Sequence, residues 1–129
     1  MTQPRTIIFV CEHGAAKSVI AAAHFNQLAS QMGRDMRAVA RGTHPDKELS
    51  AQAVQGLSEE GLTPAEATPQ KLTAEELQAA QRVITFCDLP TEYQPETRIE
   101  HWEDVPPVSK NYETARDIIV ERIHQLLNR

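Results

Sequence analysis

The chain has 129 residues, of which 40% are hydrophobic and 24% charged, and this predicts one globular domain with a single core. Its net charge of -5 argues against general nucleic-acid binding, because proteins of that class usually carry a basic surface. The N-terminal residues lack the pattern of a signal peptide, no apolar stretch reaches membrane-spanning length, and two cysteines are too few for a disulfide framework, so we expect a cytoplasmic protein with free thiols.

Short apolar segments alternate with amphipathic segments along the whole chain. Runs rich in β-branched residues predict strands over residues 6–10, 36–40, 82–86 and 98–102. Apolar residues at helical spacing predict helices over residues 18–32, 47–60 and 112–127, and a further helix that starts from Thr73 and reaches residue 80. Gly33 and Gly61 are placed to end the first two helices, and Thr73 with Glu76 forms a capping box. This alternation predicts one α/β domain over residues 1–129, with a parallel sheet covered on both faces.

The loop between the first strand and the first helix has the composition of an anion site. A helix N-terminus offers unpaired backbone amides and the positive end of the helix dipole, which favour a bound anion and the thiolate form of Cys11. Gly14 suits a positive φ, and Lys17 with Ser18 supplies a cation and a hydroxyl. The predicted nucleophile is therefore Cys11, and the predicted anion-binding residues are Glu12, His13, Gly14, Ala15, Ala16, Lys17 and Ser18.

Ligands of parallel α/β folds bind at the carboxyl ends of the strands. Cys11, Cys87, Asp88 and Asp104 follow predicted strands and should share one edge of the sheet. The five histidines show no metal-ligand spacing, so we expect no metal site and no cofactor. Arg41, which ends the second strand, is interpreted as a solvated loop arginine, with a second positive charge at the mouth of the site as the alternative.

The loop resembles the Cys-x5-Arg-Ser signature of the low-molecular-weight protein tyrosine phosphatases, whose fold is shared by the thioredoxin-linked arsenate reductases. The resemblance extends over essentially the whole chain, through segments 40–45, 83–87 and the His101-Trp102 pair. It implies a four-stranded parallel sheet with helices on both sides, and attack by Cys11 on phosphorus or arsenic. It also implies an aspartic acid that protonates the leaving oxygen, with Asp104 as the first choice and Asp88 as the second. Cys87 matches the redox cysteine of the reductases.

Three departures from that family bear on activity. Lys17 stands where the family has arginine, and a lysine is a point charge that lacks the planar fork of a guanidinium. Gly14 replaces an asparagine, so its side-chain hydrogen bonds are lost. No cysteine follows Cys87, which excludes a relay of three cysteines.

The expected partners are phosphate, arsenate or a phosphorylated substrate, together with a thiol reductant if the chain is a reductase. Phosphate monoester hydrolysis is the leading interpretation. The alternatives are arsenate reduction through Cys11 and Cys87, or oxyanion binding without turnover, which Lys17 motivates. A nucleotide-binding P-loop is disfavoured because Cys11 and Ala16 occupy the positions of its two required glycines.

Overall fold

A parallel sheet of four strands forms the centre of the computed structural model, which describes residues 5–90, 93 and 99–128. The strand order is β2-β1-β3-β4, and every neighbouring pair is parallel. The strands are β1 (Arg5–Cys11), β2 (Met36–Gly42), β3 (Arg82–Thr85) and β4 (Ile99–His101). The predicted α/β class and the four-stranded parallel sheet are confirmed.

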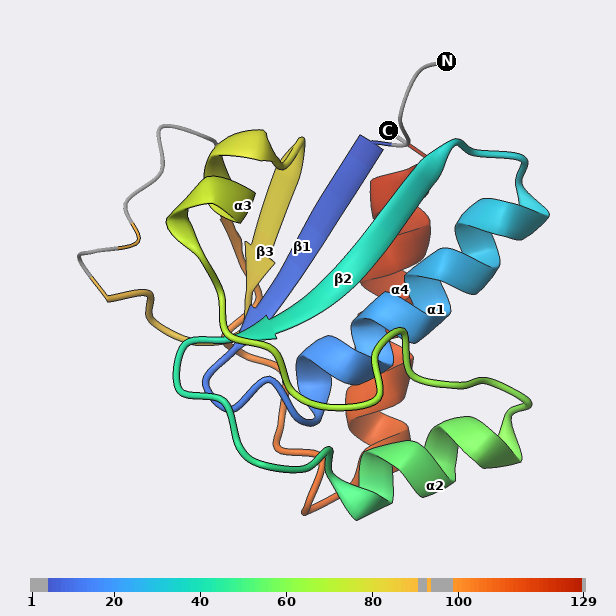
Figure 1. Cartoon of the computed structure of the whole chain (residues 1–129). Coiled ribbons are helices and arrows are strands. Elements are labelled where there is room, and N and C mark those ends of the chain that lie inside the picture. Colours follow the sequence, from blue (N-terminus) through green and yellow to red (C-terminus); the bar gives the residue numbers. More distant parts are fainter. Residues whose placement is uncertain (1–4, 91–92, 94–98, 129) are drawn as a thin grey trace.

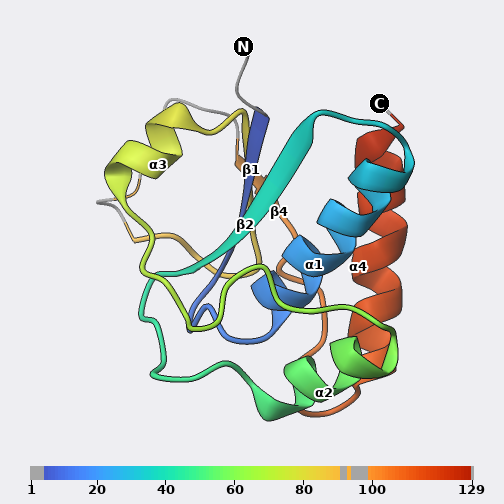
Figure 2. The same cartoon turned by 45° about the vertical axis from the view of Figure 1, so that its right-hand side comes forward.

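Helices cover both faces of this sheet (Figure 1), with α3 on one face and the other three on the opposite face. The helices are α1 (Lys17–Gln31), α2 (Ala51–Glu59), α3 (Ala74–Ala79) and α4 (Tyr112–Leu127). Figure 2 shows α1 and α4 packed side by side along the sheet. No helix in the described residues has the length and apolar character needed to cross a membrane.

Local capping explains which predicted boundaries are right. The helix predicted over residues 112–127 is confirmed, because the Asn111 side chain accepts a hydrogen bond from the Thr114 amide at 3.0 Å. The capping box of Thr73 and Glu76 is also present. The helix predicted to begin at residue 47 instead begins at Ala51. The β2 strand extends two residues beyond its predicted end, and residue 98, the predicted start of the fourth strand, lies outside the described residues.

An aromatic cluster fixes the carboxyl ends of three strands. Phe9 of β1 packs against Phe25 of α1, with ring centroids 6.0 Å apart, and against Phe86 and Trp102 at 6.4 and 5.8 Å. Phe86 and Trp102 directly follow β3 and β4 and meet edge to face at 5.9 Å. Such pairs contribute about 0.5–1.5 kcal/mol beyond the burial of their surface. The strand ends that carry the predicted site residues are thus held against one another.

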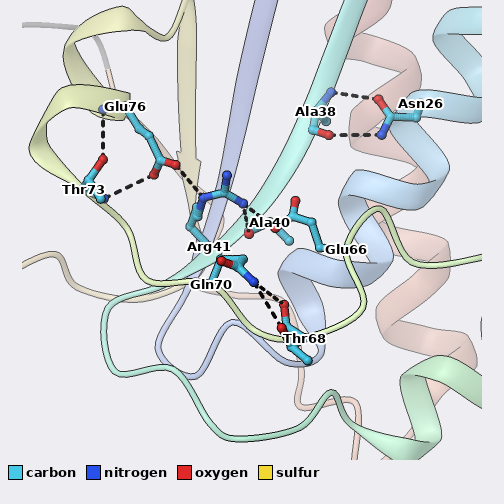
Figure 3. A network of polar contacts seen from close by, with 9 residues as sticks. All are labelled: Asn26, Ala38, Ala40, Arg41, Glu66, Thr68, Gln70, Thr73 and Glu76. Atoms are coloured by element: carbon cyan, nitrogen blue, oxygen red, sulfur yellow. Dashed lines mark hydrogen bonds and ion pairs between the residues drawn. The ribbon is translucent and has the colours of Figure 1, made fainter.

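One side chain, Asn26, hydrogen-bonds α1 to the edge strand β2 (Figure 3). Asn26 donates from Nδ2 to the Ala38 carbonyl at 3.0 Å, and its Oδ1 accepts from the Ala38 amide at 2.8 Å. These two bonds satisfy backbone groups that an edge strand leaves without a neighbouring strand. They also fix the position of α1, and with it the loop that precedes the helix.

A half-buried polar network joins α1, the end of α2 and α4. Glu60 accepts hydrogen bonds from Tyr112 Oη at 2.8 Å and Arg116 Nη1 at 2.6 Å, and its Oε2 lies 3.3 Å from His24 Nε2. Burial lowers the pKa of His24, although Glu60 opposes the shift. Burial alone would raise the pKa of Glu60, but the hydrogen bonds from Tyr112 and Arg116 outweigh it and lower that pKa.

Both shifts make the fold sensitive to acid. A folded-state pKa of His24 below its ordinary value of 6.5 means that the unfolded chain binds the proton first, so stability falls as the pH drops below that value. The lowered pKa of Glu60 adds a second loss below its ordinary value of 4.5. Urea unfolding between about pH 7 and about pH 5 should show a smaller loss of stability in His24→Gln than in wild type. His124→Gln, at an exposed residue in the last turn of α4, is the control, and equal slopes in all three proteins would contradict the expectation.

Candidate active site

The loop 12–16 links the end of β1 to the start of α1 and passes close to β2. Gly14 has a φ of +60°, the left-handed conformation predicted for it from the sequence. A Cβ atom at this residue would lie 2.8 Å from the backbone nitrogen of Gly42. Gly14 is therefore required both by its backbone conformation and by the close approach of the two chain segments.

The segment 43–50, which leads from β2 to α2, binds this loop through the loop's carbonyl groups. The amides of Thr43, His44, Asp46 and Ser50 donate at 3.3, 2.7, 3.1 and 2.9 Å to the carbonyls of Cys11, Glu12, His13 and Ala15. Within the described residues, the amides of 12–16 donate to no acceptor, and no side chain caps α1. A loop with bound carbonyls and unpaired amides at a helix N-terminus has the features of an anion cradle.

Two side chains at the start of α1 extend this arrangement. The Cys11 Sγ atom lies 3.0 Å from the Ser18 Oγ atom, close enough for the hydroxyl to donate to a thiolate. Lys17 donates from Nζ to the Val105 carbonyl at 2.7 Å. The ammonium of Lys17 therefore ties the loop that follows β4 to the cradle, a contact that the sequence did not predict.

Cys11 and Cys87 open into one cavity of about 840 Å³. Its apolar wall includes Leu49, Phe86 and Val108, and the charged residues of segment 46–48 also line it. That segment was missed as part of the site, because it was assigned to the start of a helix. The sequence held one signal that segment 46–48 belongs to the site: it follows β2, whose carboxyl end lies at the same edge of the sheet as Cys11.

The two candidate acids, Asp88 and Asp104, directly adjoin Cys87 and Val105 in the sequence. Neither Asp88 nor Asp104 lines the cavity that contains Cys11. Both carboxylate oxygens of Asp104 accept from Arg122, at 2.7 and 2.5 Å, and the side chain is 70% exposed. These bonds lower the pKa of Asp104. The role of Asp104 as a proton donor thus stays a prediction, and it requires the ion pair with Arg122 to open.

The sequence model of the family described as low molecular weight phosphotyrosine protein phosphatase matches residues 6–105, which is more than half of the chain. The chain belongs to this family. No curated protein matches it by sequence.

Solved structures agree on the fold of the phosphatase family. An arsenate reductase from Archaeoglobus fulgidus is 24% identical with a TM-score of 0.78, and the match covers 95% of this chain and 99% of that one. YfkJ from Bacillus subtilis is 19% identical with a TM-score of 0.83, covering 98% and 94%. A low molecular weight protein tyrosine phosphatase from T. tengcongensis is 21% identical with a TM-score of 0.75, covering 96% and 98%.

Arg41, at the end of β2 in this family member, is neither a solvated arginine nor a charge at the mouth of the site. Its side chain is 15% exposed and forms ion pairs with Glu66 and, at 2.8 Å, with Glu76. Figure 3 shows the guanidinium between β2 and the start of α3, where it also donates to the Ala40 carbonyl at 2.8 Å. Both interpretations from the sequence were wrong, because the partners of Arg41 lie 25 and 35 residues further along the chain.

The two thiols of this phosphatase-family protein should differ in reactivity. Burial raises the pKa of Cys87, only partly opposed by its hydrogen bond with Thr85, and the charges of Cys11, Glu12 and Asp88 raise it further. Cys11 lies instead at the end of β1, with its Sγ atom 3.0 Å from the Ser18 Oγ atom in the first turn of α1. Iodoacetate should therefore modify Cys11 first near neutral pH, and phosphate should slow that reaction. Peptide mapping of wild type and Cys87→Ser tests this, and equal labelling of both thiols without protection by phosphate would contradict it.

Proposed function

We propose that this protein hydrolyses phosphate monoesters, with aryl phosphates of the phosphotyrosine type as its substrate class. Cys11 attacks phosphorus, so that the Sγ–P bond forms while the bond from phosphorus to the leaving oxygen breaks, and water then hydrolyses the thiophosphate. The observation that carries the proposal is the position of Cys11 Sγ, 3.0 Å from Ser18 Oγ at the N-terminus of α1. Free thiols at Cys11 and Cys87 fit a reducing, cytoplasmic compartment.

The cradle and the apolar wall of the cavity bind different parts of such a substrate. The unpaired amides of loop 12–16 present fixed dipoles to the oxyanion of the substrate, and Lys17 adds a positive charge. The apolar wall of Leu49, Phe86 and Val108 offers a surface for an aromatic ring. An aryl phosphate combines the two groups that these surfaces bind.

Steady-state hydrolysis of p-nitrophenyl phosphate tests this function. We expect saturable turnover that inorganic phosphate inhibits competitively, because substrate and product occupy the same cradle. Thermal unfolding with and without phosphate is measured in parallel. A rise in Tm with phosphate but no turnover would replace the phosphatase by a domain that binds oxyanions.

A second candidate function, arsenate reduction, rests on the shared cavity of the two thiols. Attack of Cys11 on arsenate forms a Cys11 Sγ–As bond and releases water. The Cys87 thiolate then attacks Cys11 Sγ, the electron pair of the S–As bond goes to arsenic, and arsenite leaves. A dithiol reductant of the thioredoxin type reduces the resulting Cys11–Cys87 disulfide.

The two reactions differ in whether they require Cys87. Arsenate reduction should be lost in Cys87→Ser, whereas hydrolysis of p-nitrophenyl phosphate should persist, because Cys87 has no role in phosphate transfer. Intact mass after mild peroxide should show the loss of two hydrogens in wild type and not in the variant. Oxidation that stops at sulfenic or sulfinic acid on Cys11 would exclude the reductase.

A further inference from the structure

The cradle loop contains one histidine, His13, and its ring lies between two carboxylates. Its Nε2 atom lies 3.9 Å from Oε2 of Glu12, and its Nδ1 atom lies 3.5 Å from Oδ1 of Asp46. The Nδ1 atom also lies 3.2 Å from the His44 carbonyl oxygen, which can only accept a hydrogen bond. A protonated ring at this place therefore has an acceptor for its Nδ1 proton and counter-charges on two sides.

The cavity that His13 lines holds more acidic side chains than permanent cations. Among the described residues, the other charged ones that line it are Glu12, Asp46 and Glu48 on the acidic side and Lys17 and Lys47 on the basic side. With a neutral imidazole the negative charges are in excess, and a thiolate at Cys11 adds another. With an imidazolium the carboxylates and the cations are equal in number. A dianion that enters the cavity therefore meets less repulsion when His13 carries a proton.

His13 is also the residue of the cradle loop whose charge changes near neutral pH. Ordinary carboxyl and ammonium groups keep their charge between about pH 5.5 and about pH 7.5. The His13 side chain is 55% exposed, so protons from the solvent reach the ring. Its own backbone amide is one of the unpaired amides of loop 12–16. The ring is therefore close enough to a bound anion for their charges to interact, since the Debye length is about 8 Å in physiological salt.

We propose that binding of a dianion at the cradle is coupled to protonation of His13, which supplies a second cation beside Lys17; this deepens the proposed function and rests on it. Because linkage is reciprocal, the proton tightens the binding of the anion, and the bound anion favours the proton. The affinity for a dianion consequently rises as the pH falls through the range in which histidine titrates, and it drops as the ring loses its proton. The coupling requires a charge at His13 but no contact between its ring and the anion.

Sulfate is the probe for this coupling, because it stays a dianion across the pH range whereas phosphate changes its own charge. Cys11→Ser is the background protein, since it removes a thiolate whose protonation would also tighten the binding of an anion. Isothermal titration calorimetry should give a sulfate affinity ~5-fold or more higher at about pH 5.5 than at about pH 7.5. Titrations at about pH 6.5, in two buffers with different enthalpies of ionisation, should show proton uptake. His13→Asn in the same background should lose both effects.

Two further variants, each in the Cys11→Ser protein, separate charge from structure. His13→Lys carries a permanent positive charge, so it should bind sulfate tightly at both pH values. His101→Asn is the matched control, because His101 is 53% exposed and pairs with Glu103 but does not line the cavity. This control should keep the pH dependence of the Cys11→Ser protein. Thermal unfolding without sulfate checks that each variant is folded.

The possible results distinguish the coupling from the anion site itself. A pH dependence that persists in His13→Asn, or that is absent from the Cys11→Ser protein, overturns the coupling. Sulfate binding by His13→Lys as weak as that of His13→Asn also overturns it. Binding of phosphate without sulfate does the same, because the site then selects the anion by its proton and not by its charge. If neither anion binds to the folded Cys11→Ser protein, the oxyanion site fails, and the proposed function fails with it.

Discussion

Cys11→Ser should abolish hydrolysis of p-nitrophenyl phosphate while phosphate still binds. A serine hydroxyl is far less ionised than a cysteine thiol, and loss of the covalent nucleophile costs up to ~10⁶ in kcat in enzymes that form a covalent intermediate. The cradle is built from backbone amides of loop 12–16, which the substitution does not change. Turnover below ~10⁻³ of wild type, with the phosphate-induced rise in Tm retained, is the expected pair of results.

Cys87→Ser is the matched control for this experiment. The Cys87 thiol lines the same cavity but forms its hydrogen bond with Thr85 rather than with Ser18, with Thr85 Oγ1 and Cys87 Sγ 3.6 Å apart. If Cys11→Ser keeps wild-type turnover, hydrolysis does not pass through a thiophosphate. If both serine variants lose p-nitrophenyl phosphate turnover, the two thiols act together and the phosphatase mechanism proposed above is wrong.

Lys17→Arg should raise turnover by ~10-fold or more, because a guanidinium holds two equatorial oxygens of the transition state where an ammonium holds one. Lys17→Met should lower turnover by about 10²-fold, the typical loss for one oriented oxyanion contact. The contact from Lys17 Nζ to the Val105 carbonyl at 2.7 Å adds a second reason for the loss, since the methionine also releases the loop after β4. Aryl phosphate turnover of both variants, alone and combined with Cys11→Ser, measures these effects.

Lys110, an exposed lysine in the loop between β4 and α4, supplies the comparison for Lys17. Lys110 does not line the cavity, so Lys110→Met should match wild type within the error of the assay. If Lys17→Arg raises turnover and Cys11→Ser removes that gain, the lysine is what limits catalysis at this site. Unchanged turnover in Lys17→Met would instead limit Lys17 to a structural tie between the cradle and Val105.

Features set by residues close in sequence were predictable from the sequence. The capping box of Thr73 and Glu76 and the positive φ of Gly14 depend on neighbours within a few residues or on the backbone alone. The start of α2 was placed too early, because the residues before Ala51 have no strong helix-breaking signal. There the Ser50 side chain caps the helix, and the Ser50 amide bonds to the Ala15 carbonyl at 2.9 Å. A tertiary contact therefore decides a boundary that local propensity leaves open.

Features set by distant ion pairs were not predictable. Arg41 pairs with Glu66 and Glu76 on a separate segment, and Arg122 binds Asp104 across 18 residues. A charged residue in a loop has many potential partners of opposite sign, and the sequence does not rank them. For this reason the sequence placed Cys11 correctly in the fold, yet it did not foresee that Asp104 lies outside the cavity.

The hydrogen bonds between segment 43–50 and the cradle loop make anion binding a property of two loops rather than one. Because the carbonyls of Cys11, Glu12, His13 and Ala15 are already held, the cradle loses its conformational entropy when the chain folds and not when the anion arrives. Amide hydrogen exchange in segment 43–50 should consequently be slow without phosphate and change little when it is added, whereas exchange in loop 12–16 should slow on binding. Substitutions that loosen segment 43–50 should weaken phosphate binding through entropy, without any lost contact to the phosphate.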